Sequence, residues 1–175
     1  MPALDLQTLA NLAEIFGALT VVGGLFFAIT QLREFRRQRR DAVAAELMRS
    51  FYNPELARAV QRIRRFPDGI GAAELRGRGT EDEIAAILVC TTYETMGLLV
   101  YRGIAPFSMV RELTGGLAVS MYRKLEVWLA DMREELGQPS WAEWYEWLAN
   151  RLHEAAEQDP WEPAFRRHAG WKPRS

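Results

Sequence analysis

The chain has 175 residues, of which 49% are hydrophobic and 26% are charged, and its formal net charge is −1. This length leaves room for one ordinary domain with a true hydrophobic core beside an N-terminal segment. The single cysteine, Cys90, excludes an intramolecular disulfide and suits a reducing compartment.

Residues 15–32, IFGALTVVGGLFFAITQL, contain no charged side chain. As a helix this stretch would be roughly 27 Å long, close to the ~30 Å hydrocarbon core of a bilayer. A cleaved signal peptide carries its positive charge before the apolar run, whereas here it follows. A buried helix of a soluble protein seldom reaches this length without a charge. We therefore predict a single transmembrane helix, preceded by a short N-terminus, within residues 1–32.

The next stretch, residues 33–40, is strongly basic. Because positive residues near a span stay on the cytoplasmic side, the N-terminus should lie outside the cell membrane and the rest of the chain in the cytoplasm. Residues 33–52 should form a helical arm whose arginines bind anionic lipid head groups. Nucleic acid is the weaker alternative for arginines directly after a span, and we expect no nucleic-acid partner. The arginines of this lipid collar are Arg33, Arg36, Arg37, Arg39 and Arg40.

One stripe of the predicted span consists of small residues at helical spacing. Such residues let two helix backbones approach closely, so the stripe predicts a helix–helix contact with a second copy or with another membrane protein. The alternative is that glycine is simply frequent in membrane helices. The stripe residues are Ala13, Gly17, Thr20, Gly24 and Ala28.

The helical pattern begins near residue 6 and continues to residue 51. Asn53 followed by Pro54 is a typical helix start, so a second helix should run to about residue 65, with a short one at residues 70–76. Two capping boxes, at residues 80–83 and 140–143, predict helices over 80–102 and 141–157. The first should carry on one side the residues Ile84, Ile87, Leu88, Thr91, Thr95, Leu98 and Leu99.

Between these two helices, Pro106 should start a short helix that ends near residue 113. The pair Gly115-Gly116 should separate it from a longer helix over residues 117–136. No segment alternates with period two. The sequence therefore predicts an all-α protein, in which a cytoplasmic domain of five or six helices (residues 53–158) follows the span.

The C-terminal tail, residues 159–175, contains three prolines and interleaves aromatic with basic residues. This pattern suits a membrane interface, an acidic partner or single-stranded nucleic acid. We favour the simpler interpretation that Trp161 and Phe165 dock on the domain while the rest of the tail frays.

Three short motifs resemble bacterial proteins grouped as the domain of unknown function 4760 family. They are YETMGLLV followed by Arg102-Gly103, YRKL leading to Arg133, and WYEWLA near the end of the last long helix. The family is expected to have a tryptophan where this chain has Tyr122. The resemblance covers most of the chain, from the span to about residue 152. It implies a membrane-tethered helical domain and no known activity.

Glu94, in the first motif, could be a buried acid or a ligand, but a carboxylate in a helical core usually pairs with a cation. We predict a structural ion pair with Arg133, with Arg64 as an alternative partner. The two histidines, His153 and His168, occur in no metal-binding spacing, and Cys90 has no activating neighbour. We therefore expect no catalytic residue, metal or cofactor.

The first functional hypothesis is a non-enzymatic membrane protein whose partners are lipids and other proteins or itself, as a homo-oligomer or as an accessory subunit of a membrane complex. The alternative is a membrane-tethered sensor with a small-molecule pocket in its helical domain. An enzyme centred on Glu94 is the third and weakest hypothesis.

Overall fold

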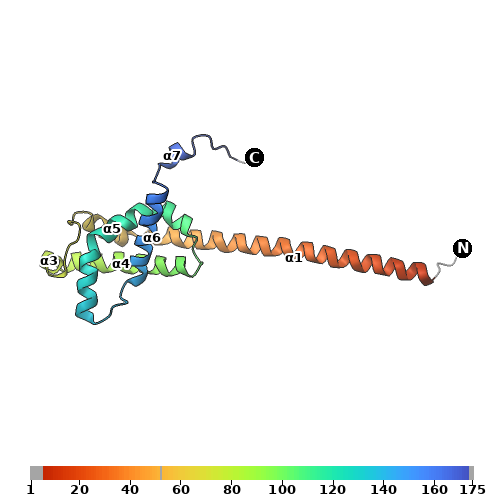
Figure 1. Ribbon diagram of the computed structural model, residues 1–175, viewed down its shortest axis with the longest axis horizontal. Coiled ribbons are helices and arrows are strands. Elements are labelled where there is room, and N and C mark those ends of the chain that lie inside the picture. Colours follow the sequence, from red (N-terminus) through yellow and green to blue (C-terminus); the bar gives the residue numbers. More distant parts are fainter. Residues whose placement is uncertain (1–5, 52, 174–175) are drawn as a thin grey trace. The chain divides into compact units, whose positions relative to one another are not determined.

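The computed structural model describes the backbone of residues 6–51 and 53–173, with side chains at 14–17, 19–35, 38, 42, 49 and 53–173. Within these ranges the fold is all-α, as predicted, with seven helices and no strand (Figure 1). The chain divides into two compact units, Met1–Ala45 and Glu46–Ser175.

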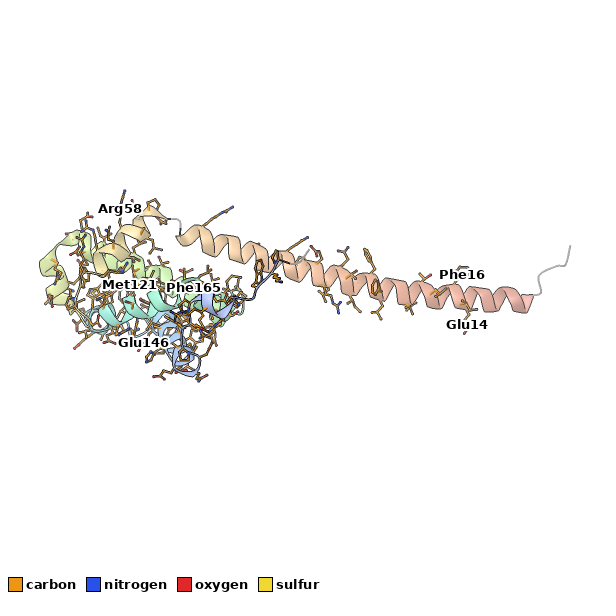
Figure 2. All side chains as sticks on the ribbon, turned by 90° about the horizontal axis from the view of Figure 1, so that it is seen from above. Glu14, Phe16, Arg58, Met121, Glu146 and Phe165 are labelled. Carbon is orange, nitrogen blue, oxygen red and sulfur yellow. The ribbon has the colours of Figure 1, made fainter. Side chains whose placement is uncertain are left out.

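Helix α1 extends over Leu6–Phe51, 46 residues. The prediction of one continuous helix from near residue 6 to residue 51 is therefore confirmed. The hydroxyls of Thr20 and Thr30 each donate to the carbonyl of a residue one turn earlier, at 2.8 Å. These hydrogen bonds satisfy the polar side chains within the helix itself. Figure 2 shows Glu14 and Phe16 projecting outward from α1.

In the part of the chain that the structure describes, two helices are long and apolar enough, by length and composition, to cross a membrane. They are the Glu14–Phe35 segment of α1, of which no part is buried, and Thr80–Tyr101, of which 39% is buried. The second is the central helix of the helical domain.

The helical domain contains α2 (Pro54–Ile63), α3 (Ala72–Arg78), α4 (Thr80–Tyr101), α5 (Phe107–Leu136), α6 (Glu143–Gln158) and the short α7 (Ala164–Arg167). Helix α4 is central, because α2 and α6 both pack against it and α5 packs against α6. Helix α3 contacts both α4 and α5. The largest fully buried side chains, which define the core, include Trp128, Tyr93, Tyr145, Met121 and Leu125.

Of the three helix caps predicted from local sequence patterns, one agrees with the structure and two differ. Asn53 caps α2 as expected, since its side-chain oxygen accepts from the amide of Glu55 at 2.9 Å. The capping box predicted at Thr80 is wrong: the cap position is Gly79, at φ 118°, and makes no side-chain cap. The box at Ser140 is also wrong, because α6 begins at Glu143 after Ala142 in the left-handed conformation.

Carboxylates from other helices take the place of a local cap at α3 and α6. Asp131 on α5 accepts from the amide of Ala72 at the start of α3, at 2.7 Å. Glu94 on α4 accepts from the amide of Tyr145 in the first turn of α6, at 2.8 Å. Both contacts join residues more than 50 positions apart in the chain, which is why local capping patterns could not predict them.

The predicted break at Gly115-Gly116 is also wrong, because α5 continues through both glycines as one helix of 30 residues. The indole of Trp161 lies against this pair, and a Cβ added at Gly116 would approach its ring more closely than 3.0 Å. The glycines therefore admit a neighbouring side chain rather than ending the helix. The predicted docking of Trp161 is confirmed, whereas Phe165 is 73% exposed and does not dock.

Candidate functional site

The three motifs of the sequence meet where α4, α5 and α6 pack together. The ring of Tyr93 stacks on that of Tyr145, with centroids 5.0 Å apart, and Tyr122 contacts Tyr145 edge-on at 5.4 Å. The hydroxyls of Tyr93 and Thr114 are hydrogen-bonded at 2.9 Å, and the hydroxyl of Tyr145 donates to the carbonyl of Ala118 at 3.1 Å. We call the set Tyr93, Glu94, Thr114, Tyr122, Arg133, Tyr145 and Glu146 the junction cluster.

Glu94 joins α4 to the N-terminus of α6. Burial raises the pKa of Glu94 above its ordinary value, although the amides of Tyr145 and Trp144 act in the opposite direction. Gly97, one turn later on the same face, permits this contact. A Cβ there would lie closer than 3.0 Å to the backbone carbonyl of Trp144. The spacing Glu94-x-x-Gly97 thus supplies an acceptor and the room for a second helix on the same face.

The predicted ion pair between Glu94 and Arg133 is wrong as a direct contact. Arg133 is paired with Glu146 at 2.6 Å, and it also donates to the carbonyls of Trp141 at 2.8 Å and Ala142 at 3.3 Å. These carbonyls lie in the loop that reverses the chain before α6, so the guanidinium fixes that loop. At longer range its charge still lowers the pKa of Glu94.

The polar groups of the junction cluster are engaged with each other or with the backbone. Burial raises the pKa of the neighbouring Cys90 thiol, which disfavours the reactive thiolate. His153 is exposed and lies 3.5 Å from Glu157 on its own helix. Among the described residues, no group of three or more His, Cys, Asp or Glu side chains could hold a metal ion. This arrangement positions α4, α5 and α6 against one another.

The apolar side of α4 that the sequence pattern groups together is largely exposed. Ile84 is 53% exposed, Ile87 41% and Leu98 37%, while Thr91 and Thr95 lie exposed between them. The buried side consists of Ala85, Ala86, Val89, Cys90, Tyr93, Met96 and Gly97.

Periodicity could not identify the buried side of α4, because both sides of this helix are apolar. Two helices pack closely on α4, so its smaller residues and the motif residues Tyr93 and Gly97 face them. The motif residues were the signal that could have identified the buried side. We call the apolar residues Ile84, Ile87, Thr91, Thr95 and Leu98 the outer face of α4.

The threonines of the outer face do not make it polar. The hydroxyl of Thr91 donates to the carbonyl of Ile87 at 2.9 Å, and that of Thr95 donates to the carbonyl of Thr91 at 2.9 Å. With the hydroxyls turned to the backbone, these residues present methyl groups to the surroundings. No ionisable side chain lies in the outer face from Ile84 to Leu98.

Four residues of the predicted small-residue stripe, Gly17, Thr20, Gly24 and Ala28, lie exposed on α1. A Cβ at Gly17 or Gly24 would meet no atom within 4 Å. Arg33 of the predicted collar is exposed. The side chains of the remaining stripe and collar residues, Ala13, Arg36, Arg37, Arg39 and Arg40, lie outside the described residues.

A cleft of about 490 Å³ lies between the first half of α5 and the C-terminal segment. Arg111 and Arg167 both pair with Asp159, at 2.9 Å and 3.2 Å. Trp161 forms one wall, over the glycines of α5. This cleft depends on α5 being continuous through Gly115-Gly116, so it could not be predicted from a pattern that suggested a break there.

The fold defines the class of the protein: a long, exposed apolar N-terminal helix followed by an all-α domain held by a junction of tyrosines and internal carboxylate caps. The chain belongs to the family described as domain of unknown function (DUF4760), which matches residues 18–152. The match covers more than three quarters of the chain, and it confirms the resemblance read from the motifs. Comparisons with curated proteins and with solved structures find no match.

Proposed function

We propose that this chain is a non-enzymatic, single-pass membrane protein whose cytoplasmic helical domain mediates protein–protein assembly, as a homo-oligomer or as an accessory subunit of a membrane complex. The observation that carries the proposal is the Glu14–Phe35 segment of α1, of which no part is buried. Its large apolar side chains, such as Phe16, Val21 and Phe26, are each about two-thirds exposed. Each such side chain gains about 1.5–3 kcal/mol on leaving water, and lipid offers that environment along the whole segment.

The charge distribution supports an orientation for the span. The arginines that follow it would hold the C-terminal side in the cytoplasm and would contact anionic head groups, at about 1 kcal/mol each near the surface. On this proposal the N-terminus lies outside the inner membrane and lipids are the first partners. Nucleic acid is not among the proposed partners.

Two apolar surfaces support assembly. The small-residue stripe of α1 would let a second membrane helix approach closely, and the outer face of α4 is an exposed apolar surface on the helical domain. The junction cluster supports a non-enzymatic role, because its polar side chains are engaged in positioning helices.

The test uses the full chain. Membranes are washed with alkaline carbonate and then extracted with mild detergent, and the mass of the extracted protein is measured by light scattering. We expect the chain to resist the wash and to elute with the mass of two or more copies, or with a second protein at fixed ratio. Release into water without detergent would overturn the membrane proposal, and a lone monomer in detergent would overturn the assembly proposal.

Gly24→Ile tests the stripe within this scheme. The larger side chain should keep a second helix away and lower the oligomer mass in detergent, while the thermal unfolding of the helical domain stays unchanged. Val22→Ile, on another face of the same helix, is the matched control and should keep the parent mass. An unchanged mass for Gly24→Ile would show that the stripe is not the contact.

A second candidate function is the membrane-tethered sensor, and the cleft beside the C-terminal segment favours it. A ligand there would contact Arg111 and Trp161 and could release the segment from α5. A thermal-shift screen of the full chain with nucleotides and lipids tests this candidate. A response that disappears in Arg111→Ala would support it, whereas a flat response to every ligand would count against it.

A further inference from the structure

The spacing of the residues along the outer face of α4 is the same from either end of the helix. Its apolar positions are 84, 87, 91, 95 and 98, with steps of three, four, four and three. One step of four beyond each end lie Thr80 and Arg102, so the pattern extends symmetrically about Thr91. At 1.5 Å per residue the apolar part is about 21 Å long.

A palindromic face is self-complementary under one particular symmetry. If a two-fold axis passes beside Thr91 and lies across the helix, a second α4 packs antiparallel on the first. Ile84 then meets Leu98 of the other copy, Ile87 meets Thr95, and the two Thr91 residues meet at the centre. Large side chains would flank the centre, and the methyl of Thr91 would allow close approach there.

The charges at the two ends of the face also match under this symmetry. Arg102 follows the last turn of α4, whereas Glu81 lies in the first turn, 3.7 Å from Arg62 and with its side chain 75% exposed. In the antiparallel pair each Arg102 lies beside Glu81 of the other copy, which gives one opposite-charge contact at each end. A face that served lipid alone would need neither the matching ends nor the symmetric spacing.

We propose that two copies of this chain pair through the outer faces of α4, antiparallel and centred on Thr91. This inference rests on the proposed assembly function and specifies its contact.

The small area of the outer face limits the strength of the pairing. One helix face of this length falls below the ~800 Å² that each partner contributes to a standard interface. The contact alone is therefore weak, and a common membrane raises the effective concentration of the two domains enough for it to form. We accordingly expect pairing in the full chain that is sensitive to single substitutions.

Cysteine cross-linking tests the axis directly. In a Cys90→Ala background, Thr91→Cys puts the only thiol at the centre of the face, and Ala130→Cys puts it on an exposed position of α5. With the full chain in its membrane under a mild oxidant, Thr91→Cys should form a covalent dimer several times faster than Ala130→Cys. Equal rates for the two positions would overturn the proposed axis.

Charge exchange provides a second, independent test. Glu81→Arg and Arg102→Glu each place like charges together at both ends, so each should weaken dimerisation by roughly fivefold. The double variant should restore the parent value. Double-variant affinity that is no better than that of either single change would contradict the antiparallel register.

A disruptive variant separates this inference from the wider proposal. Ile87→Glu places an exposed charge in the face and should reduce the mass to that of a monomer. Leu113→Glu is the matched control, an exposed apolar position on α5, and should leave the mass unchanged. If the parent chain is oligomeric and Ile87→Glu keeps its mass, the α4 contact is overturned while assembly through another surface stands. If the parent chain is a lone monomer, both proposals fall.

Discussion

The Glu14–Phe35 segment of α1 and helix α4 have the same length and a similar apolar character, yet the structure uses them differently. None of the first is buried, and more than a third of the second is. The difference lies in a few side chains. α4 carries Tyr93, Glu94 and Gly97, which bond to or admit other helices, whereas in the α1 segment the hydroxyls of Thr20 and Thr30 bond to their own helix. Apolar composition makes a helix able to cross a membrane. Polar contacts with other helices distinguish the helix that is packed into the domain.

Matched lysine substitutions test this contrast most strongly. Val89→Lys puts a charge at a fully buried position of α4 and should cost about 4 kcal/mol or more, enough to unfold a marginally stable domain. Leu25→Lys, at an exposed position of α1, should leave the urea unfolding transition of the domain unchanged and reduce the membrane-integrated fraction instead. A loss of domain stability in Leu25→Lys would break the contrast.

Gly97→Ala tests the close approach of α6 to α4. The added Cβ would meet the carbonyl of Trp144, a backbone atom that cannot rotate away, so we expect a loss of about 2–3 kcal/mol in the free energy of unfolding. Gly77→Ala in α3 is the control, because nothing lies within 4 Å of a Cβ there. It should be neutral or stabilising by up to about 1 kcal/mol. Equal effects at the two glycines would show that the contact is not tight.

Much of the fold follows from the sequence because its signals are local. The length of α1, the cap at Asn53 and the helix ends at Gly103 and Gly137 all depend on residues within a turn of each other. The break predicted in α5 failed for the opposite reason. Whether Gly115-Gly116 ends a helix or admits a neighbour depends on Trp161, more than 40 residues away.

Glu94→Ala and Glu94→Gln separate the cap from the rest of the junction cluster. Alanine leaves the first-turn amides of α6 without their acceptor and should lower the free energy of unfolding by about 1–3 kcal/mol. Glutamine keeps an acceptor oxygen and should recover at least half of that loss. Both are measured by urea denaturation followed by circular dichroism. If glutamine is as damaging as alanine, the charge of Glu94 matters more than its hydrogen bond.

The site was predictable only as a set of participating residues. The motifs named Tyr93, Glu94, Arg133 and Tyr145, and all four meet at the junction. The partners could not be assigned, because the position of Arg133 relative to Glu94 and Glu146 depends on where α6 begins. The sequence suggested a start at Trp141, and the left-handed Ala142 delays it to Glu143. Because α6 begins two residues later than predicted, the carbonyls of Trp141 and Ala142 stay in the loop and accept from Arg133, which also pairs with Glu146.

The smallest expected effect concerns Tyr93 of α4 and Tyr145 of α6, whose rings stack on each other. Burial raises the pKa of Tyr93 from 10.0 to about 12, and burial also raises the pKa of Tyr145. Since the unfolded chain releases these protons first, the stabilisation is fully present below pH 10 and is lost as the pH rises toward 12.

Tyr93→Phe removes one of these groups and the hydrogen bond to Thr114. It should therefore cost about 1 kcal/mol at pH 7 and make the alkaline loss of stability less steep. Urea unfolding at pH 7, 10 and 11 measures both quantities. An alkaline slope identical to that of the parent chain would mean that Tyr93 ionises alike in the folded and unfolded states, and that its hydroxyl is not part of what holds α4 in the domain.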